Sequence, residues 1–121
     1  MTKTSPRSDR GSRSELVRGS LEILILKALA TGPLHGLGIA RRVEQLTGGA
    51  FEVKAGSLFP ALHRLEEGGW LDAEWGESET RRKARFYRLT AEGQKRLRRE
   101  TGTWRRVALA LAQALSAPAE G

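Results

Sequence analysis

Apolar residues recur with helical spacing along much of the chain, and the most informative stretch runs from Lys54 to Leu71. One face of a helix there would carry the residues spaced i, i+3, i+4 and i+7, namely Leu58, Ala61, Leu62 and Leu65. The opposite face would carry Gly56, Phe59, Pro60, His63 and Arg64. A solvated face normally carries Glu, Lys and Gln, so an aromatic, a histidine and an arginine indicate a face that meets a partner. The pattern predicts a short helix that begins near Ala55, ends at Gly68 and Gly69, and packs through one face only.

Two further helices are predicted before this one. The first covers about residues 15–30, with Ser14 as its N-cap and a stop at residues 31–33, where glycine and proline end the helix. Its core face is formed by Leu21, Leu24, Ile25, Ala28 and Leu29, widened by Ile23 and Leu26. The second covers about residues 35–46 and ends at Gly48 and Gly49. Its inward residues are predicted to be Leu37, Ala40, Val43 and Leu46, and its outward residues Arg41, Arg42 and Glu44.

Two strands are predicted after the glycine pair, over residues 70–75 and 84–89. Leu71, Ala73 and Trp75 alternate in the first, and Phe86 stands between Arg85 and Tyr87 in the second, which predicts a two-stranded hairpin with one face on the helices. The cations at its tip are Arg81, Arg82 and Lys83, with Arg85 just after. They suit contact with a nucleic-acid backbone or minor groove, and the alternative is a charged tip that only keeps the strand edge soluble.

A long final helix is predicted over residues 91–115, with Thr90 as its cap. Its apolar side, here called the seam, consists of Leu97, Trp104, Val107, Ala108, Leu111 and Leu115. Leu97, Trp104 and Leu111 lie seven residues apart, as in a coiled coil, so the seam is expected to form a two-fold dimer interface. The alternative is that the seam packs back on the first helix.

Charge changes the picture, because the chain has a net charge of +7 and a pI near 10.8. Residues 81–106 hold eleven cations and two anions, whereas residues 21–80 hold five cations and nine anions. A polyanion is the expected partner, and it should bind where the hairpin and the start of the final helix come together.

The composition excludes several classes of site. With no cysteine, a disulfide framework, a thiolate zinc site and a cysteine nucleophile are absent. His35 and His63 fall on different helices and match no metal-binding or triad spacing, so neither an enzyme nor a metal or cofactor site is expected. No signal peptide and no apolar run long enough for a membrane span is found, so a cytoplasmic protein is expected.

The order helix, helix, turn, helix, hairpin is that of a winged helix-turn-helix, a mainly α (α+β) fold that binds double-stranded DNA. The third helix would lie in the major groove and the wing would reach phosphates or a neighbouring groove. The expected DNA contacts are Lys54, Ser57, Phe59, His63, Arg64, Arg81, Arg82, Lys83, Arg85 and Tyr87. RNA or a protein partner is the alternative for the basic surface, although the chain lacks a cluster of stacking aromatics.

Three blocks of sequence carry a family resemblance: GSLEILILKALATGPLHGLGIARRVEQLTGG, GSLFPALHRLEEGGWLDAEWG and RRKARFYRLTAEGQKRL. In this order and spacing they resemble the PadR family of bacterial transcriptional regulators over about residues 16–97. The resemblance implies a winged helix-turn-helix that dimerises through its C-terminal helix and usually represses transcription at an inverted-repeat operator. The family usually has tyrosine at positions 37 and 59, so Leu37 is not expected to contact phosphate and Phe59 can do so only without a hydroxyl.

The sequence pattern also predicts a division of the chain, and the resemblance adds a ligand class. We expect a flexible basic arm over residues 1–13, the winged helix-turn-helix over 14–89, a dimerisation helix over 90–115 and a frayed tail over 116–121. The short C-terminal part is similar to the smaller subfamily, some members of which bind aromatic or drug-like compounds near the dimer interface. Trp104 would contact such an effector here, and the other interpretation is that this tryptophan only packs in the seam.

Overall fold

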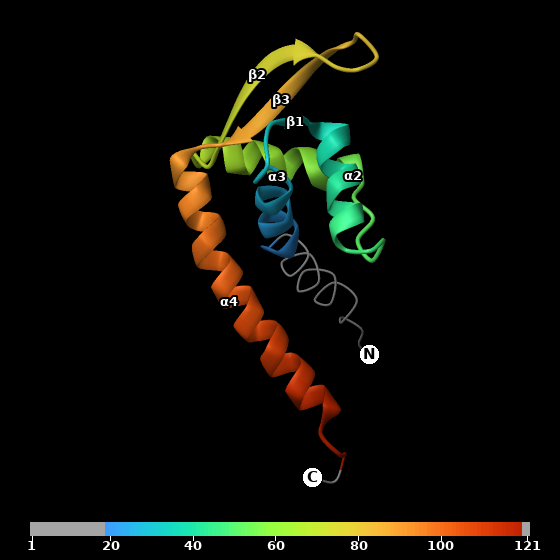
Figure 1. The fold of residues 1–121 in the computed structure, drawn as a ribbon, viewed down its shortest axis with the longest axis vertical. Helices are drawn as coiled ribbons and strands as arrows, with labels where there is room; N and C mark the ends of the chain where they lie inside the picture. The colour runs from blue at the N-terminus through green and yellow to red at the C-terminus, as the bar shows by residue number, and fades with distance from the viewer. Residues whose placement is uncertain (1–18, 120–121) are drawn as a thin grey trace, which may run out of the picture.

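The computed structural model describes residues 19–119. A helix described over residues 19–28 is followed by β1 (Leu34–His35), α2 (Gly36–Leu46), α3 (Ala55–Glu67), β2 (Leu71–Glu77), β3 (Lys83–Leu89) and α4 (Ala91–Ser116). The N-terminal helix, α2 and α3 gather beneath the sheet, and α4 leaves this group as a long arm (Figure 1). The predicted basic arm and the Ser14 cap lie outside the described residues.

The core lies where the N-terminal helix, α2 and α3 meet the sheet. Both predicted core faces are confirmed there: the buried residues include Leu21, Ile25, Ala28 and Leu29 of the first segment and Leu58, Ala61, Leu62 and Leu65 of α3. Gly68 is the C-cap of α3, and Gly69 follows with a φ of 84°, a left-handed conformation that suits glycine. The glycine pair therefore ends the helix and turns the chain into β2.

The predicted inward face of α2 is wrong at two positions. Leu37 and Leu46 are exposed, whereas Ile39 is fully buried together with Ala40 and Val43. The sequence of α2 supports two overlapping helical phases, and the structure adopts the one that places Ile39 in the core. Leu37 is thereby directed to the surface beneath the wing.

The sheet has three strands among the described residues rather than the two predicted. The short strand β1 pairs with β3 in the order β1-β3-β2, all antiparallel. The register places Ala73 opposite Tyr87 and Glu74 opposite Phe86. Tyr87 therefore faces the core, while Phe86 lies on the outer face against the His35 ring, with the two ring centres 5.4 Å apart. The sequence pattern did not decide which face of β3 is inward, and the register assigns that face to Tyr87.

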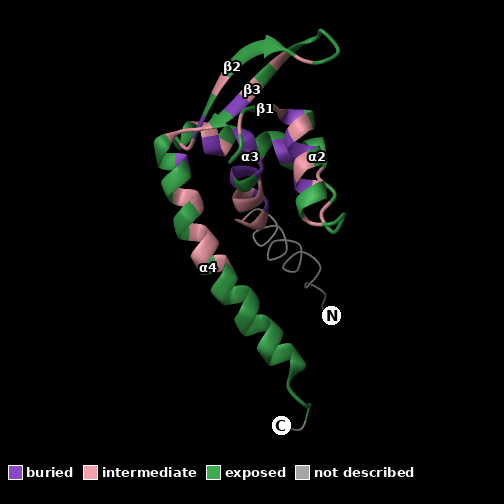
Figure 2. Cartoon of the chain, viewed as in Figure 1, coloured by how far each residue is buried: buried purple, intermediate pink, exposed green. Residues whose placement is uncertain are grey.

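The helix α4 begins as predicted at Thr90, whose hydroxyl accepts a hydrogen bond from the Gly93 amide and donates one to the Gly69 carbonyl. Its first half is partly covered by the domain, with Leu97 against the core, and its second half is exposed (Figure 2). Within residues 19–119, no helix has both the length and the apolar character needed to cross a membrane.

Two glycines of α4 provide a matched test of how the helix meets the domain. A Cβ atom at Gly93 would overlap the carbonyl oxygen of Trp70, whereas a Cβ at Gly102 would lie 3.6 Å from its nearest neighbour, the flexible Arg106 side chain. Gly93→Ala should therefore lower the free energy of unfolding by about 2 kcal/mol or more. Gly102→Ala should raise it by about 0.5–1 kcal/mol, because alanine favours a helix. Urea unfolding measures both, and equal effects would contradict the close packing at Gly93.

Candidate nucleic-acid interface

The N-terminal end of α3 is open to solvent. Lys54, Gly56, Ser57 and Phe59 are all exposed, and the N-cap Lys54 makes no side-chain cap hydrogen bond. The first turn of α3 carries no acidic side chain. The free amides and the positive end of the helix dipole are therefore available to an anion such as a phosphate.

A hollow of about 490 Å³, here called the wing hollow, lies between the start of α2, α3 and the hairpin. It is lined by His35, Gly36, Leu37, Arg41, Phe59, Trp75, Ser78, Glu79, Thr80, Arg82, Lys83, Ala84, Arg85 and Tyr87. The hollow thus joins five of the predicted contact residues, from two elements far apart in the sequence. A Cβ at Gly36 would come within 3.0 Å of the Phe59 ring, so the glycine lets this ring rest on the start of α2.

The inner face of the hairpin carries Trp75, Lys83 and Arg85. The Lys83 Nζ lies 5.5 Å from the centre of the Trp75 ring, a cation–π contact at the surface. Arg85 Nη2 lies 2.6 Å from Glu66 Oε2 and so ties the wing to the last turn of α3. The contact of Lys83 lies within the hairpin, whereas that of Arg85 holds the wing against α3.

The tip of the hairpin is a tight turn that presents Arg81 and Arg82 to solvent. The Ser78 amide donates to the Arg82 carbonyl over 2.9 Å, and the Arg81 amide donates to the Ser78 carbonyl over the same distance. Arg81 has a φ of 62°, a left-handed conformation that is uncommon outside glycine. The tip projects beyond the helices (Figure 1), so its cations are well placed for a bulky partner.

Tyr87 differs from the other predicted contacts because it is only 8% exposed. Burial, opposed by Arg85 and reinforced by Glu66, raises the pKa of its hydroxyl above the ordinary value. Tyr87 nevertheless lines the wing hollow. A contact between Tyr87 and DNA stays a prediction.

The side chains of the second half of α3 make ion pairs within the chain that the sequence did not predict. His63 and Glu67, one turn apart, are 3.3 Å from each other and well exposed. Arg64 Nε lies 2.9 Å from Glu22 Oε2 on the N-terminal helix, so this arginine is held by the domain itself. Contacts of His63 and Arg64 with phosphate stay predictions, and such a contact of Arg64 would compete with Glu22.

Sequence reasoning missed nine of the residues that line the wing hollow, among them Leu37, Arg41 and Trp75. Leu37 was predicted to be inward, yet its side chain is 57% exposed. Trp75 is 62% exposed, because β2 at that point has passed beyond the helices that cover Leu71. The signal for Trp75 was present in the sequence, since a tryptophan four residues past a buried strand start lies near the end of a hairpin.

The cations of the hairpin tip and those of α4 lie at opposite ends of β3. The helix α4 starts directly after the base of the hairpin, whereas the cations of the tip lie at the opposite end of β3 (Figure 1). Seven residues of strand separate the two ends, which corresponds to about 20 Å. Binding of a polyanion where the hairpin and the start of α4 come together stays a prediction, and the cations of the tip lie away from that place.

The seam residues follow one side of α4 but have two environments. Leu97 packs against the core, and Trp104 lies near Gly19, where a Cβ would be 3.6 Å from the indole ring. Val107, Leu111 and Leu115 are exposed, the last at 84%. Packing back on the N-terminal helix thus accounts for the first half of the seam, and the second half has no cover among the described residues.

Comparisons with known proteins agree on one family. The model of the family described as "Transcriptional regulator PadR-like family" matches residues 25–99. The structure is similar to a transcriptional regulator from Clostridium thermocellum, with a TM-score of 0.71 and 26% identity over 82% of this chain and 96% of that one. A PadR family transcriptional regulator from Eggerthella lenta gives a TM-score of 0.68 and 27% identity over 95% of this chain and all of the other.

A curated relative extends the likeness in sequence. An uncharacterized protein from Lysinibacillus sphaericus is 27% identical over 95 residues, which cover 78% of this chain and 87% of the relative. The family match covers more than half of this chain, and the three-stranded sheet, α3 and the wing are arranged as in the solved PadR structures. The chain therefore belongs to the PadR-like family of transcriptional regulators, DNA-binding proteins with a winged-helix fold rather than enzymes.

Proposed function

We propose that the protein is a homodimeric repressor that binds an inverted-repeat operator, with one α3 and one wing in each half-site. The observation that carries this proposal is the wing hollow, in which the exposed Phe59 of α3 faces the cationic inner side of the hairpin. A hollow open to solvent and bounded by a helix N-terminus and a basic wing suits a sugar-phosphate backbone better than a small molecule.

Each element has a proposed role. The start of α3, with Lys54 and Ser57, would supply base-edge and phosphate contacts, and Phe59 an apolar contact with a thymine methyl or a sugar. Arg81, Arg82 and Lys83 would supply affinity that does not depend on sequence. Arg85 would act mainly by holding the wing against Glu66. Sequence recognition and electrostatic affinity would thus come from different elements.

The second half of the seam supports the dimer. Val107, Leu111 and Leu115 form an exposed apolar strip on a helix that extends past the domain (Figure 2). Apolar surface of this kind on a protruding helix is typical of an interface with an identical helix. A two-fold dimer would present two copies of α3, which matches an inverted repeat.

An effector and a cellular location complete the proposal. A small aromatic or drug-like molecule would relieve repression by contacting Trp104, which is half-buried next to the N-terminal helix. The contact with Gly19 supports a packing role for this tryptophan as well. A repressor of this kind would act in the cytoplasm, on the nucleoid when bound.

Competition binding tests the proposed partner. A labelled duplex from a randomised-sequence selection is titrated with the full-length protein, in the presence of unlabelled duplex or of single-stranded RNA with the same number of phosphates. The affinity for the selected duplex should exceed the affinity for the RNA by about a thousandfold at physiological salt. We therefore expect the unlabelled inverted-repeat duplex to displace the labelled duplex, and the RNA to displace it far less.

Two outcomes would contradict the proposal. RNA that competes as well as the selected duplex would support a basic module for RNA. A selection that enriches no inverted repeat would contradict the proposal that a dimer binds an inverted-repeat operator. A scrambled duplex of equal length is the control, because it measures the electrostatic part of the affinity alone.

A further inference from the structure

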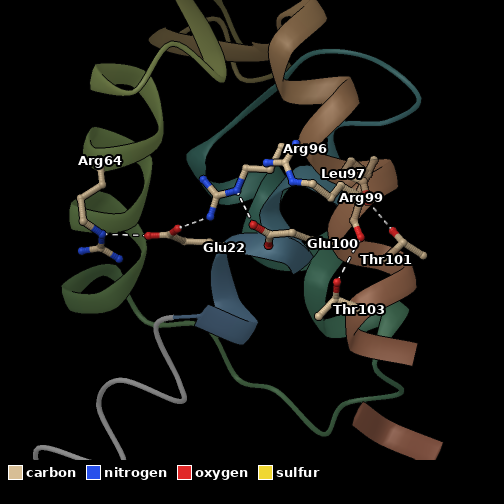
Figure 3. Close-up of polar contacts among 8 residues, drawn as sticks. All are labelled: Glu22, Arg64, Arg96, Leu97, Arg99, Glu100, Thr101 and Thr103. Atoms are coloured by element: carbon tan, nitrogen blue, oxygen red, sulfur yellow. Dashed lines mark hydrogen bonds and ion pairs between the residues drawn. The ribbon is translucent and has the colours of Figure 1, made fainter. Parts of the chain in front are cut away.

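Glu22 of the N-terminal helix joins two elements that the proposed function uses separately. Its Oε2 accepts a hydrogen bond from Arg64 Nε of α3 over 2.9 Å, and its Oε1 accepts one from Arg96 Nη2 of α4 over 2.9 Å (Figure 3). The Glu22 side chain is only 13% exposed. One carboxylate therefore links the helix that reads DNA to the helix that carries the seam.

Arg96 is the more constrained of the two arginines. Its Nε also donates to Glu100 Oε2 over 2.7 Å, and its guanidinium lies 4.2 Å from the centre of the Trp70 ring. Burial disfavours the charged form, but hydrogen bonds to Glu100 and Glu22 outweigh it and raise the pKa of Arg96 above its ordinary value. The guanidinium is therefore held from three sides, and the contact with Glu22 is the one that leads to α3.

The contact between Glu22 and Arg96 lies near the start of α4, so a small change of angle there moves the far end of the helix by a large distance. From Arg96 to Leu115 the helix extends about 28 Å, at about 1.5 Å per residue. A tilt of about 10° at Arg96 would move the far end by about 5 Å. That is more than the rise of one base pair, about 3.4 Å. In a two-fold dimer joined through the far half of α4, a small tilt at each root would change the separation of the two α3 helices.

We infer that Glu22 is a positioning residue that fixes the angle between α3 and α4 and so sets the half-site spacing that the dimer accepts. The inference rests on the proposed function, because spacing has meaning only for a dimer on an inverted repeat. Glu22 itself contacts no DNA in this scheme. It acts through Arg64 and Arg96, and its loss would loosen the spacing requirement without changing which bases are read.

The test compares spacing selectivity with base selectivity in the full-length protein. Duplexes carry the selected half-sites with the spacer changed by one or two base pairs in either direction, and a second set carries single base changes in one half-site. The wild-type protein should prefer its own spacer by about tenfold or more. Glu22→Gln, which keeps the size of the side chain and removes its charge, should reduce that preference to about threefold or less while single base changes keep their effect.

Glu100→Gln is the matched control. It removes another carboxylate from the same arginine, but Glu100 lies one turn away within α4, so the link to α3 remains. This variant should keep the wild-type spacer preference. Glu22→Asp should give an intermediate preference, because it retains the charge on a side chain one methylene shorter, and it carries the test if Glu22→Gln does not fold.

The outcomes separate the inference from the function on which it rests. An unchanged spacer preference in Glu22→Gln, or an equal loss in Glu100→Gln, would overturn the positioning role. A loss of base selectivity in step with spacer selectivity would also overturn it, because that result would indicate general damage to α3. A wild-type protein without any preference for an inverted repeat would instead overturn the proposed function.

Discussion

Leu111→Glu is expected to give a folded monomer whose affinity for an inverted-repeat duplex is about a hundredfold lower, or more. Leu111 is 56% exposed in the single chain, in the uncovered half of the seam, so the substitution should leave the domain intact. In a dimer the same position would bury a carboxylate without a partner. Light scattering measures the mass, and a binding titration measures the affinity that the second half-site contributes.

Leu109 supplies a matched control, because it is 67% exposed on the same turn of α4 yet points to the side opposite the seam. Leu109→Glu should remain a dimer and bind the duplex as the wild type does. If Leu109→Glu becomes monomeric and Leu111→Glu does not, the interface lies on the other side of the helix. If both remain dimers, the interface lies outside the far half of α4.

Arg81→Ala combined with Lys83→Ala is expected to weaken binding to specific and non-specific duplexes by the same factor. Both side chains are exposed at the tip of the wing, where they would neutralise phosphates without reading bases. The slope of log affinity against log salt should become shallower by about 0.9 for each phosphate that the variant no longer neutralises. Titrations between low and physiological salt measure this slope directly.

Arg88→Ala combined with Arg105→Ala is the control for net charge, because it removes the same two charges from surfaces outside the wing hollow. Arg88 lies on the outer face of β3 and Arg105 on exposed α4. This pair should leave the salt slope nearly unchanged. Equal salt slopes for the wild type and the wing variant would show that the tip does not contact phosphates.

Local patterns predicted the helices well, because each depends on residues within a few turns. The face of α3 with Leu58, Ala61, Leu62 and Leu65, the glycines after it and the Thr90 cap are all local signals, and the structure confirms them. The pattern failed where two phases compete. The choice between Leu37 and Ile39 in α2, and between Phe86 and Tyr87 in β3, depends on packing partners that no local pattern contains.

The strand β1 and the ion pairs of Glu22 could not be predicted from the sequence for a different reason. A two-residue strand has no periodicity to detect, and its pairing with β3 joins segments more than fifty residues apart. Arg64 and Arg96 lie 42 and 74 residues from Glu22. Spacing rules describe neighbours on one helix, so they cannot identify a carboxylate shared by two distant arginines.

The left-handed backbone at Arg81 sets the stability of the turn against the binding of nucleic acid. Glycine or asparagine would adopt this φ of 62° with less strain, by about 1 kcal/mol, and would give a more stable turn. The arginine at that position instead provides a cation on the exposed turn of the hairpin. Laboratory evolution for heat resistance alone would therefore be expected to replace Arg81 early, and the resulting robust variants would bind nucleic acid less tightly.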